Sequence, residues 1–433
     1  MTGALQPAER PYRAPLIAFL VANVVSICGT RVSAIAIPWF VLMTTGSPFK
    51  TGVVALAEML PLVVSKAIGG PLIDRIGPRK VSVTADTASA VVVAMIPLLH
   101  AVHLLSFPAL LVLVGVAGAF RGPGDGAKGT LIPDIAEAAR EPLERVTGLE
   151  STTERLAGFI AFAAAGGLIA LVGETNALLV DAASFAICAV LIRTWAPGRH
   201  AVAEADDGAD DGSYRQRLHE GWRFLSRDKL MMPLVLMIAV TNLLDAAVMS
   251  VLLPVWIRDH GYGPAQTGLI MTAFAVFATI FALVAAAIGE RIPRRLAFTL
   301  GFLVCGAPRF VVLALDVPFW TVLAVVAVGG VGAGFINPIL GALFIERIPR
   351  AMLGRVSSLA ESLGWAGIPL GGILAGAAIA GIGLAPALLA AGAMYLLATV
   401  SPPLIGRSEN WGGRTRQPSA EADPAPRPAV PAG

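Results

Sequence analysis

Long apolar stretches, separated by short polar ones, follow one another along almost the whole chain. An apolar stretch of about 20 residues is long enough to cross a bilayer as a helix, so the pattern predicts twelve membrane-spanning helices. The first six predicted spans are Ala14 to Met43, Thr51 to Ile73, Val81 to Val102, Phe107 to Ile132, Val146 to Val172 and Thr175 to Trp195. The other six are Met231 to Trp256, Ala265 to Gly289, Leu296 to Leu315, Val317 to Ile345, Val356 to Ala380 and Leu384 to Ile405.

The composition favours the same fold class, an all-α membrane protein. Of the 433 residues, 56% are hydrophobic and only 14% are charged, a combination that soluble domains rarely show. Cys28, Cys188 and Cys305 lie inside apolar stretches without CxxC spacing, so neither a disulfide framework nor a metal site is indicated. HExxH, GxSxG and paired histidine and carboxylate clusters are absent from the spans, so we expect no catalytic site and no enzyme activity.

The loop charges predict how the chain is oriented in the membrane. One set of loops carries nearly all the arginines, whereas the other set carries only Lys50 and Arg258. The positive-inside rule then places both termini in the cytoplasm. The first apolar stretch is too long for a secretory signal, so we expect it to remain as the first span of an inner-membrane protein.

The two halves of the sequence repeat each other at an offset of about 216 residues. Four features coincide: Asp74–Ile76 with Glu290–Ile292, Arg79 with Arg295, Pro38 with Pro254, and Thr51–Gly52 with Thr267–Gly268. Parallel repeats of this kind enclose a binding site near the membrane midplane. The predicted layout is a cytoplasmic segment 1–13, a six-helix bundle 14–195, a linker 196–230, a second six-helix bundle 231–405 and a disordered tail 406–433.

The linker has two parts. Its acidic and glycine-rich part, Asp206 to Gly212, favours a solvated connection; a calcium loop is the alternative, but the required alternation of ligands is missing. Leu218, Trp222 and Leu225 then lie at helical spacing, opposite several arginines. This pattern predicts a helix at the membrane surface.

Ionisable residues inside membrane helices are costly, and each is therefore a candidate for function. Counting 1.5 Å per residue places Glu58 and Arg31 at similar depths, so they could form a pair. Without a partner, Glu58 would tend to hold a proton because burial disfavours its charge. Glu58 and Asp245 are the leading candidates for proton coupling, and Asp245 could equally be a structural partner of Asn242 or of a neighbouring helix.

Three further residues are candidates for the cavity or for its movement. Arg309 is the only charged residue of its span and should face the cavity, an anionic substrate or a carboxylate of another helix. Asn337–Pro338 follows a glycine-rich stretch and predicts a closely packed, interrupted helix, either for bending or for packing. Asp86 lies nearer the cytoplasmic end, where pairing with Lys128 or Arg121 would suit a structural or gating role.

The connection between the second and third spans carries a specific motif. Gly70, Asp74, Arg75, Gly77, Arg79 and Lys80 predict a tight cytoplasmic turn in which Gly70 lets a helix end pack closely. Their spacing resembles the signature loop of the major facilitator superfamily. Glu290, Arg291 and Arg295 occupy the matching loop of the second half.

Other stretches resemble the exporter branch of that superfamily, which contains macrolide efflux proteins and the enterobactin exporter. They are Thr45–Pro48, Leu131–Asp134 and Gly354–Leu359. Gly158, Gly166 and Gly167 match the glycine-rich fifth span of exporters, although Phe162 and Ala163 replace its usual Gly-Pro pair. The resemblance implies the twelve-helix fold and a gating role for Asp74 and its neighbouring arginines.

These observations predict a proton-coupled exporter of a lipophilic small molecule such as a drug, an antibiotic or a siderophore. An uptake carrier or facilitator for a small metabolite, or a non-transporting sensor of the same fold, is the alternative. A primary pump is disfavoured because Gly122–Thr130 lacks the Gly-Lys-Ser/Thr of a phosphate loop. We expect a proton gradient as energy source and no cofactor. The expected partners are the substrate and the bilayer, with no nucleic acid and no second subunit.

Overall fold

The computed structural model describes residues 13–197, 214–288, 293–349 and 352–405. Within these ranges the regular structure is helical, and twelve helical stretches are long and apolar enough to cross a membrane. The predicted fold class and number of spans are therefore confirmed. The calcium-loop alternative and the disordered tail fall outside the described residues.

Eight helices form the first half. They are α1 (Ala14–Thr45), α2 (Pro48–Ile68), α3 (Gly70–Ile76), α4 (Pro78–Ala101), α5 (Phe107–Thr130), α6 (Ile132–Ala139), α7 (Leu143–Val172) and α8 (Glu174–Trp195). Proline at the first or second position starts most of them, because its missing N–H costs nothing there. Ser47 and Ser106 also cap α2 and α5 by accepting hydrogen bonds from backbone N–H groups.

The second half begins with the linker helix α9 (Tyr214–Arg227) and contains the remaining elements. They are α10 (Met231–Ala247), the π-helical segment η1 (Val248–Leu252), α11 (Leu253–Asp259), α12 (Pro264–Ile288), α13 (Arg294–Cys305), α14 (Ala307–Ala314), α15 (Phe319–Arg347), α16 (Leu353–Trp365), α17 (Ile368–Ile382) and α18 (Leu384–Ile405). The predicted helix in the linker is confirmed, and it buries Leu225 while Trp222 stays exposed.

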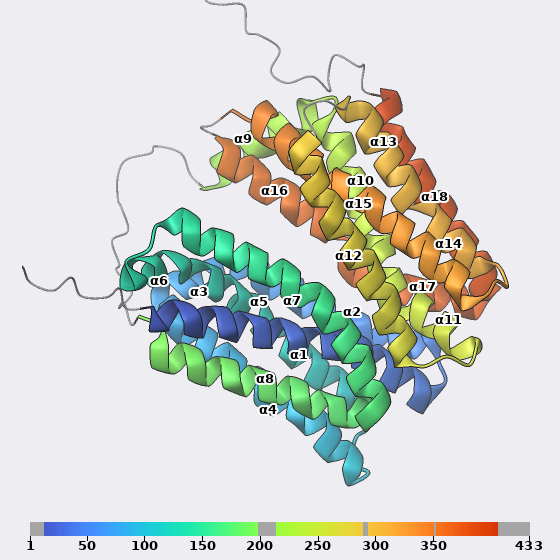
Figure 1. Ribbon diagram of the computed structural model, residues 1–433, viewed down its shortest axis with the longest axis horizontal. Helices are drawn as coiled ribbons and strands as arrows, with labels where there is room; N and C mark the ends of the chain where they lie inside the picture. The colour runs from blue at the N-terminus through green and yellow to red at the C-terminus, as the bar shows by residue number, and fades with distance from the viewer. Residues whose placement is uncertain (1–12, 198–213, 289–292, 350–351, 406–433) are drawn as a thin grey trace, which may run out of the picture.

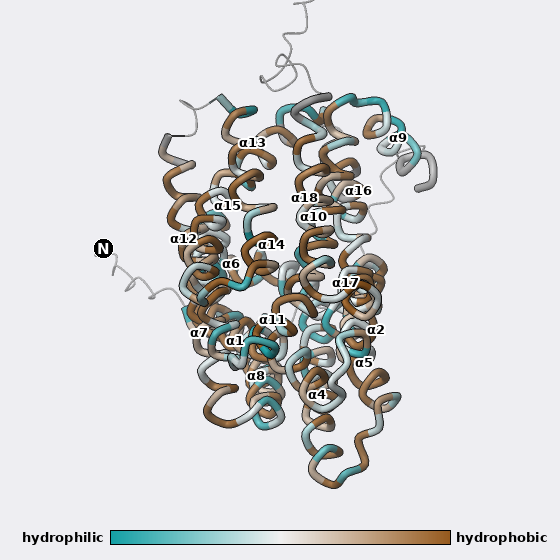
Figure 2. Tube along the Cα trace, turned by 90° about the vertical axis from the view of Figure 1, so that its right-hand side faces the viewer, coloured by the Kyte–Doolittle hydropathy of each residue, from teal (hydrophilic) through white to brown (hydrophobic). Residues whose placement is uncertain are grey.

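The two halves are separate bundles that meet at one end (Figure 1). The blue-to-green helices α1–α8 make one bundle and the yellow-to-red helices α10–α18 the other. The tube coloured by hydropathy is apolar along the spans and polar at helix α9 and several connections (Figure 2). We call the end with the arginine-rich connections after α2, α5, α8, α12 and α15 the basic end, and the other the opposite end.

Repeated glycines bring the two bundles together at the opposite end. A β-carbon at Gly52 of α2 would overlap the backbone of Gly372 in α17, and one at Gly268 of α12 would lie 3.0 Å from the Cα of Gly166 in α7. Gly52 and Gly268 are equivalent in the repeat. Small residues permit such close backbone approach between membrane helices. Arg258 strengthens this end by donating to the carbonyl of Gly46 at 3.4 Å.

Several helix boundaries differ from the sequence prediction. The second span ends at Ile68 rather than Ile73, and the expected tight turn contains the short helix α3 before Gly77 reverses the chain with a φ of 93°. The helix with Asn337–Pro338 is continuous, whereas the ninth and eleventh spans are the interrupted ones, at Gly306 and after Trp365. Pro338 therefore does not mark a break, whereas Pro308 and Pro369 begin the helices that follow the two breaks.

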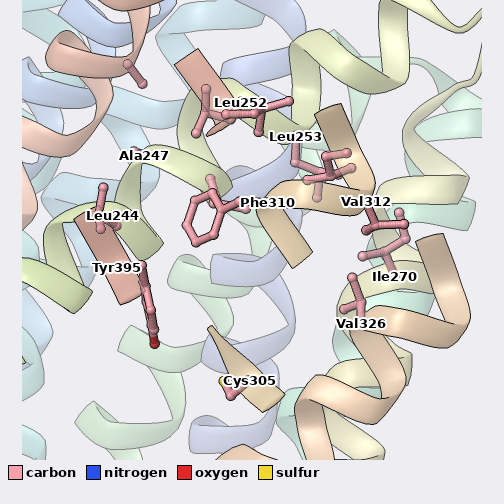
Figure 3. Packing of buried hydrophobic residues seen from close by; sticks show 14 of the residues in the cluster. Leu244, Ala247, Leu252, Leu253, Ile270, Cys305, Phe310, Val312, Val326 and Tyr395 are labelled. Atoms are coloured by element: carbon pink, nitrogen blue, oxygen red, sulfur yellow. The ribbon is translucent and has the colours of Figure 1, made fainter. Parts of the chain in front are cut away.

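Each bundle has its own apolar core. The first-half core gathers residues of α1, α4, α5, α7 and α8. The second-half core includes Leu244, Phe310 and Tyr395, which lie together in Figure 3. Trp39 and Leu42 of α1 join the second-half core, so that core extends across the contact between the bundles.

Two ion pairs fix α15 at the basic end. Arg294 binds Glu346 through two hydrogen bonds of 2.6 and 2.8 Å, which hold the pKa of that carboxyl below its usual value. Asp228 binds Arg347 at 2.8 Å and accepts the N–H groups of Leu230 and Met231 at the start of α10. Burial opposes its charge, but these hydrogen bonds outweigh that effect and lower the pKa of Asp228.

Candidate functional site

A cavity of about 230 Å³ lies beside the contact between the two bundles. Phe162 of α7 is its first-half wall, and the rest comes from the second half. Its lining is mostly apolar, with phenylalanine and methionine side chains and one ion pair: Phe162, Asp245, Val248, Met249, Leu253, Ile270, Met271, Phe274, Ala275, Arg309, Leu313 and Val326. Apolar cavities with a few polar groups are the usual form of small-molecule sites.

Asp245 of α10 and Arg309 of α14 form the ion pair in this cavity. The two side chains are exposed to different extents, 43% for Asp245 and 12% for Arg309. Arg309 lies over the rings of Phe310 and Tyr395, each about 5.0 Å from its guanidinium carbon. The Asp245 carboxylate is thus the more accessible member of the pair, whereas the Arg309 guanidinium is packed against the two aromatic rings. The prediction that Arg309 faces the cavity or reaches a carboxylate of another helix is confirmed.

The π-helical segment η1 begins three residues after Asp245 and supplies two wall residues, Val248 and Met249. Pro254 follows it and cannot donate a backbone hydrogen bond to the preceding turn, which accounts for the irregular winding. π-helical turns are frequent at functional sites. Pro38 at the equivalent place in α1 lies inside a continuous helix, so this irregularity belongs to the second half alone.

Glu58 pairs with Arg121 of α5, at 3.3 Å, and not with Arg31. The correction has a steric reason: a β-carbon at Gly118 would overlap the carbonyl oxygen of Glu58, so α2 and α5 pack tightly at this level. Arg121 also donates to Thr30 at 3.5 Å. Arg31 instead lies over the ring of Phe162, with its guanidinium carbon 4.7 Å from the ring centre.

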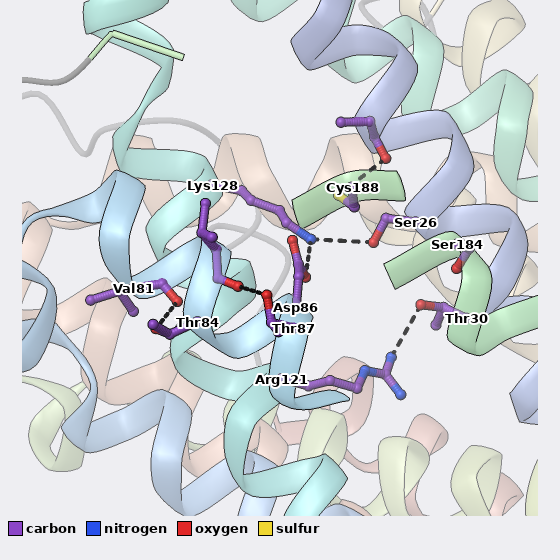
Figure 4. Close-up of polar contacts among 12 residues, drawn as sticks. Ser26, Thr30, Val81, Thr84, Asp86, Thr87, Arg121, Lys128, Ser184 and Cys188 are labelled. Atoms are coloured by element: carbon purple, nitrogen blue, oxygen red, sulfur yellow. Dashed lines mark hydrogen bonds and ion pairs between the residues drawn. The ribbon is translucent and has the colours of Figure 1, made fainter. Parts of the chain in front are cut away.

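A second buried pair lies nearer the basic end of the first half. Lys128 donates to Asp86 at 2.9 Å and to Ser26 at 3.3 Å, as the dashed lines in Figure 4 show. The two charged side chains are only 8% and 4% exposed. The predicted pairing of Asp86 with Lys128 is confirmed, and it links α1, α4 and α5.

Comparison with known families decides the identity of this fold. Residues 19–249 and 235–431 match the Major Facilitator Superfamily. The chain belongs to this superfamily. It is accordingly a multi-pass membrane transporter, as its motif loop suggested.

Several superfamily proteins are similar over nearly their whole length. The multidrug efflux pump Tap of Mycobacterium tuberculosis is 31% identical over 373 residues, which are 84% of this chain and 87% of Tap. Tap of Mycolicibacterium fortuitum is 30% identical, over 91% and 96% of the two chains. Macrolide efflux protein A of Streptococcus pyogenes is 22% identical, over 88% and 93%.

Solved structures of superfamily members share the fold. A variant of the nucleoside transporter NupG aligns with a TM-score of 0.74 and 15% identity, covering 91% of this chain and 100% of that one. A bacterial homolog of the human lysosomal transporter Spinster aligns with a TM-score of 0.65 and 14% identity, covering 93% and 98%.

The superfamily loop lies at the basic end, with its residues in different surroundings. Asp74 and Arg75 are exposed, and Asp74 makes no ion pair with the described residues. Arg79 donates to the carbonyl of Arg193 at the end of α8. The close packing expected of Gly70 belongs to Gly69, because a β-carbon at Gly69 would lie 3.4 Å from the Cα of Pro123 in α5 while one at Gly70 would meet open space.

The second-half loop is described only in part. Glu290 and Arg291 lie outside the described residues, whereas Arg295 belongs to the first turn of α13. The predicted gating roles of both loops, including Lys80 and Gly77, stay predictions.

Two other groups of predicted residues need correction. Asn242 donates to the carbonyl of Gly364 at 3.0 Å and ties α10 to α16, whereas Asn337 is exposed on α15; neither is among the residues that line the cavity. Of the three glycines expected to pack in the fifth span, Gly166 does so. A β-carbon at Gly158 or Gly167 would meet no described atom within 4 Å.

Sequence reasoning missed the first-half wall of the cavity. Phe162 stood out only as a departure from the exporter pattern, yet it lines the cavity and its ring contacts the Arg31 guanidinium. The ring fills space that the usual Gly-Pro pair would leave open. The departure itself was the signal that could have identified it.

Proposed function

We propose that this transporter exports lipophilic drugs in exchange for protons, by alternating access. The observation that carries the proposal is the accessible carboxylate of Asp245, paired with Arg309, in a mostly apolar cavity at the junction of the bundles. Phe162, Phe274 and Met271 offer apolar and polarisable walls to a drug. The names of the Tap pumps and of macrolide efflux protein A support drug export.

The charges of the connections support an orientation with the basic end in the cytoplasm. With the basic end in the cytoplasm, both termini are cytoplasmic and the protein lies in the inner membrane. The bundles then meet at the outer end, so this conformation would receive its substrate from the cytoplasm. Rocking of the bundles about the cavity would release it outside.

The loop of α3 would act when the bundles close at the cytoplasmic end. Asp74 forms no ion pair with any residue that the structure describes, so it would be available to bind a cation of the second half after closure. This arrangement would stabilise the outward-facing form. It would also explain why a single carboxylate stands exposed among Arg75, Arg79 and Lys80.

The proton gradient would supply the energy, with no cofactor, no nucleic acid and no second subunit required. Export against a gradient requires that proton and drug binding differ between the two conformations. Glu58 and Asp245 each lie beside an arginine, so loss of either carboxylate charge would free a guanidinium. Such a change could bias the equilibrium between conformations.

Inside-out membrane vesicles with an acid interior provide the test. Erythromycin, tetracycline and ethidium would be added separately, with a pH-sensitive dye reporting loss of the gradient. We expect at least one compound to discharge the gradient in wild type, and Asp245→Asn to abolish this effect. Asn337→Gln is the matched control, because Asn337 is exposed and does not line the cavity.

Three outcomes would contradict the proposal. A compound that crosses with wild type but without proton movement would indicate a facilitator, and binding without flux would indicate a sensor. Growth that depends on one solute would indicate an uptake carrier.

A further inference from the structure

Asp181 of α8 is the most deeply buried carboxylate that the proposed transport cycle has not used. The residue is 1% exposed. Ser33 of α1 donates to one carboxyl oxygen. The hydroxyl of Ser184 donates to the backbone carbonyl of Asp181 at 2.7 Å and lies 3.3 Å from the other carboxyl oxygen. Within the described part of the chain no cation forms an ion pair with it, in contrast to Glu58, Asp86 and Asp245.

Gly29 of α1 creates the space that this carboxyl group occupies. A β-carbon at Gly29 would overlap an oxygen of Asp181 and the hydroxyl of Ser184. Helix α8 can therefore place its carboxyl group directly against the backbone of α1. No larger residue could stand at Gly29 without moving Asp181 away.

The internal repeat relates Gly29, and the carboxyl group beside it, to the cavity of the second half. Adding the offset of 216 residues to Gly29 gives Asp245, the carboxylate of the cavity. In the first half, a carboxyl group therefore lies beside Gly29, the position of α1 that is equivalent to Asp245. This carboxyl group belongs to Asp181 of α8 and not to α1 itself. The same offset takes Val93 of α4 to Arg309. The second-half carboxylate has an arginine, whereas the equivalent first-half position is a valine.

The charged groups around Asp181 do not replace the missing arginine. Arg121 interacts electrostatically with Asp181 but forms its ion pair with Glu58. On α1, Arg31 lies over Phe162. On α4, which packs on α8, Asp86 is neutralised by Lys128 of α5.

We propose that Asp181 is a neutral, protonated carboxyl group in this conformation and carries the proton that is exchanged for drug. This inference rests on the proposed function as an antiporter. An ionised carboxylate with Ser33 as its close hydroxyl donor, no paired cation among the described residues and almost no access to water is strongly disfavoured. Its O–H bond would break only when repacking of α1 against α8 admits water, which takes the proton and leaves the carboxylate to be reprotonated from the other side.

Infrared spectroscopy of the purified full chain tests the protonation state. The spectrum of wild type minus that of Asp181→Asn, taken at neutral pH, should contain the carbonyl stretch of a protonated carboxylic acid. Ser33→Ala keeps the carboxyl group but removes a donor, so it should shift this band without abolishing it. A difference spectrum without the band would overturn the inference.

Transport measured in liposomes tests the role of the proton. With each of erythromycin, tetracycline and ethidium, Asp181→Asn should exchange drug across the membrane as wild type does, but drug-dependent proton flux should fall to that of empty liposomes. The asparagine retains a carbonyl acceptor for Ser33, and Ser33→Ala should preserve proton flux. If the hydrogen bond between Ser33 and Asp181 only held α1 and α8 together, the Ser33 and Asp181 variants would instead be equally defective in drug exchange.

The outcomes separate this inference from the function on which it rests. If wild type moves drug without protons, antiport itself is refuted and the carrier role falls with it. If wild type couples the two fluxes and Asp181→Asn couples them equally well, only the role of Asp181 is refuted.

Discussion

The two halves have the same fold but hold their charged side chains in different places. In the second half the ion pair of Asp245 and Arg309 opens onto a cavity, and the carboxylate is 43% exposed. In the first half the pair of Asp86 and Lys128 is closed inside the bundle, at 4% and 8% exposure. The first half therefore uses this pair to hold helices together, whereas the second half exposes a carboxylate to the cavity.

This difference shows that the repeat conserves the shape of the bundle and not its chemistry. Small residues recur where the bundles touch, as at Gly52 and Gly268. The charged positions inside the spans do not recur, since Phe274 stands at the place of Glu58 and Asn337 at the place of Arg121. Each variant below tests whether a charged or small residue acts within a bundle or between the bundles.

The largest effect should come from separating the closed pair of the first half. Lys128→Met leaves Asp86 buried without its cation, which should lower the free energy of unfolding by about 3–5 kcal/mol. Thermal unfolding in detergent would measure the loss. The double variant Asp86→Asn with Lys128→Met should recover most of it, because no unpaired charge then stays buried. Equal stability of Lys128→Met and wild type would contradict the structural role.

Removing the charge of Asp245, and with it the ion pair to Arg309 in the cavity, should affect transport far more than folding. Asp245→Asn should reduce drug efflux by about tenfold or more, since a lost charged hydrogen bond to a ligand costs about 1.5–3 kcal/mol. Its unfolding free energy should fall by less than that of Lys128→Met, because Asp245 is partly solvated and Arg309 keeps its contacts with the rings of Phe310 and Tyr395. Efflux and thermal unfolding of the same preparation would give both values. A variant that is unstable yet transports normally would reverse the comparison between the halves.

The contact between the halves can be changed at two neighbouring glycines. Gly166→Val places a side chain against Gly268 and should destabilise the closed opposite end by about 1–3 kcal/mol, whereas Gly167→Val should have little effect. Labelling of an Ala55→Cys variant, at the α2–α17 contact, would report this opening after replacement of the native cysteines. Equal labelling in both backgrounds would show that the glycine contact does not close this end.

The smallest effect should be a loss of stability at the basic end that depends on pH. Asp228 accepts the N–H groups of Leu230 and Met231 and pairs with Arg347, so Asp228→Asn, which removes the charge that binds Arg347, should lower the free energy of unfolding by about 1 kcal/mol at pH 7. Since folding lowers the pKa of Asp228, its contribution is present at neutral pH and is lost as the pH falls below about 4. Unfolding curves at several pH values would show the two proteins converging in acid. A difference that grows in acid would be contrary to this account.

The sequence predicted the fold well because membrane helices must be long and apolar. Spans such as Phe107–Thr130 and Leu384–Ile405 were located to within a few residues. The breaks were harder to predict, because Gly306 interrupts a helix where Tyr395 approaches from α18, and a single sequence does not reveal such a neighbour. The length of an apolar stretch determines where a helix crosses the membrane, but contacts with neighbouring helices determine where the helix is interrupted.

The site was only partly predictable. Asp245 and Arg309 could be recognised because charge is rare inside a span, and their pairing required only that the helices be adjacent. Depth alone suggested Arg31 as the partner of Glu58, but depth gives no rotation about the helix axis, and Arg121 lies on the facing side of α5. Asp181 could have been found from the repeat, since the glycine that admits it aligns with Asp245.

Equilibrium drug binding to the purified protein tests most directly whether the second half binds drug while the first half carries the proton. The account predicts that Asp245→Asn weakens binding of a transported drug by about tenfold or more, a change of about 1.4 kcal/mol or more. It also predicts that Asp181→Asn binds as wild type does but releases no proton when the drug is added. Normal binding by Asp245→Asn together with normal proton release by Asp181→Asn would contradict this account.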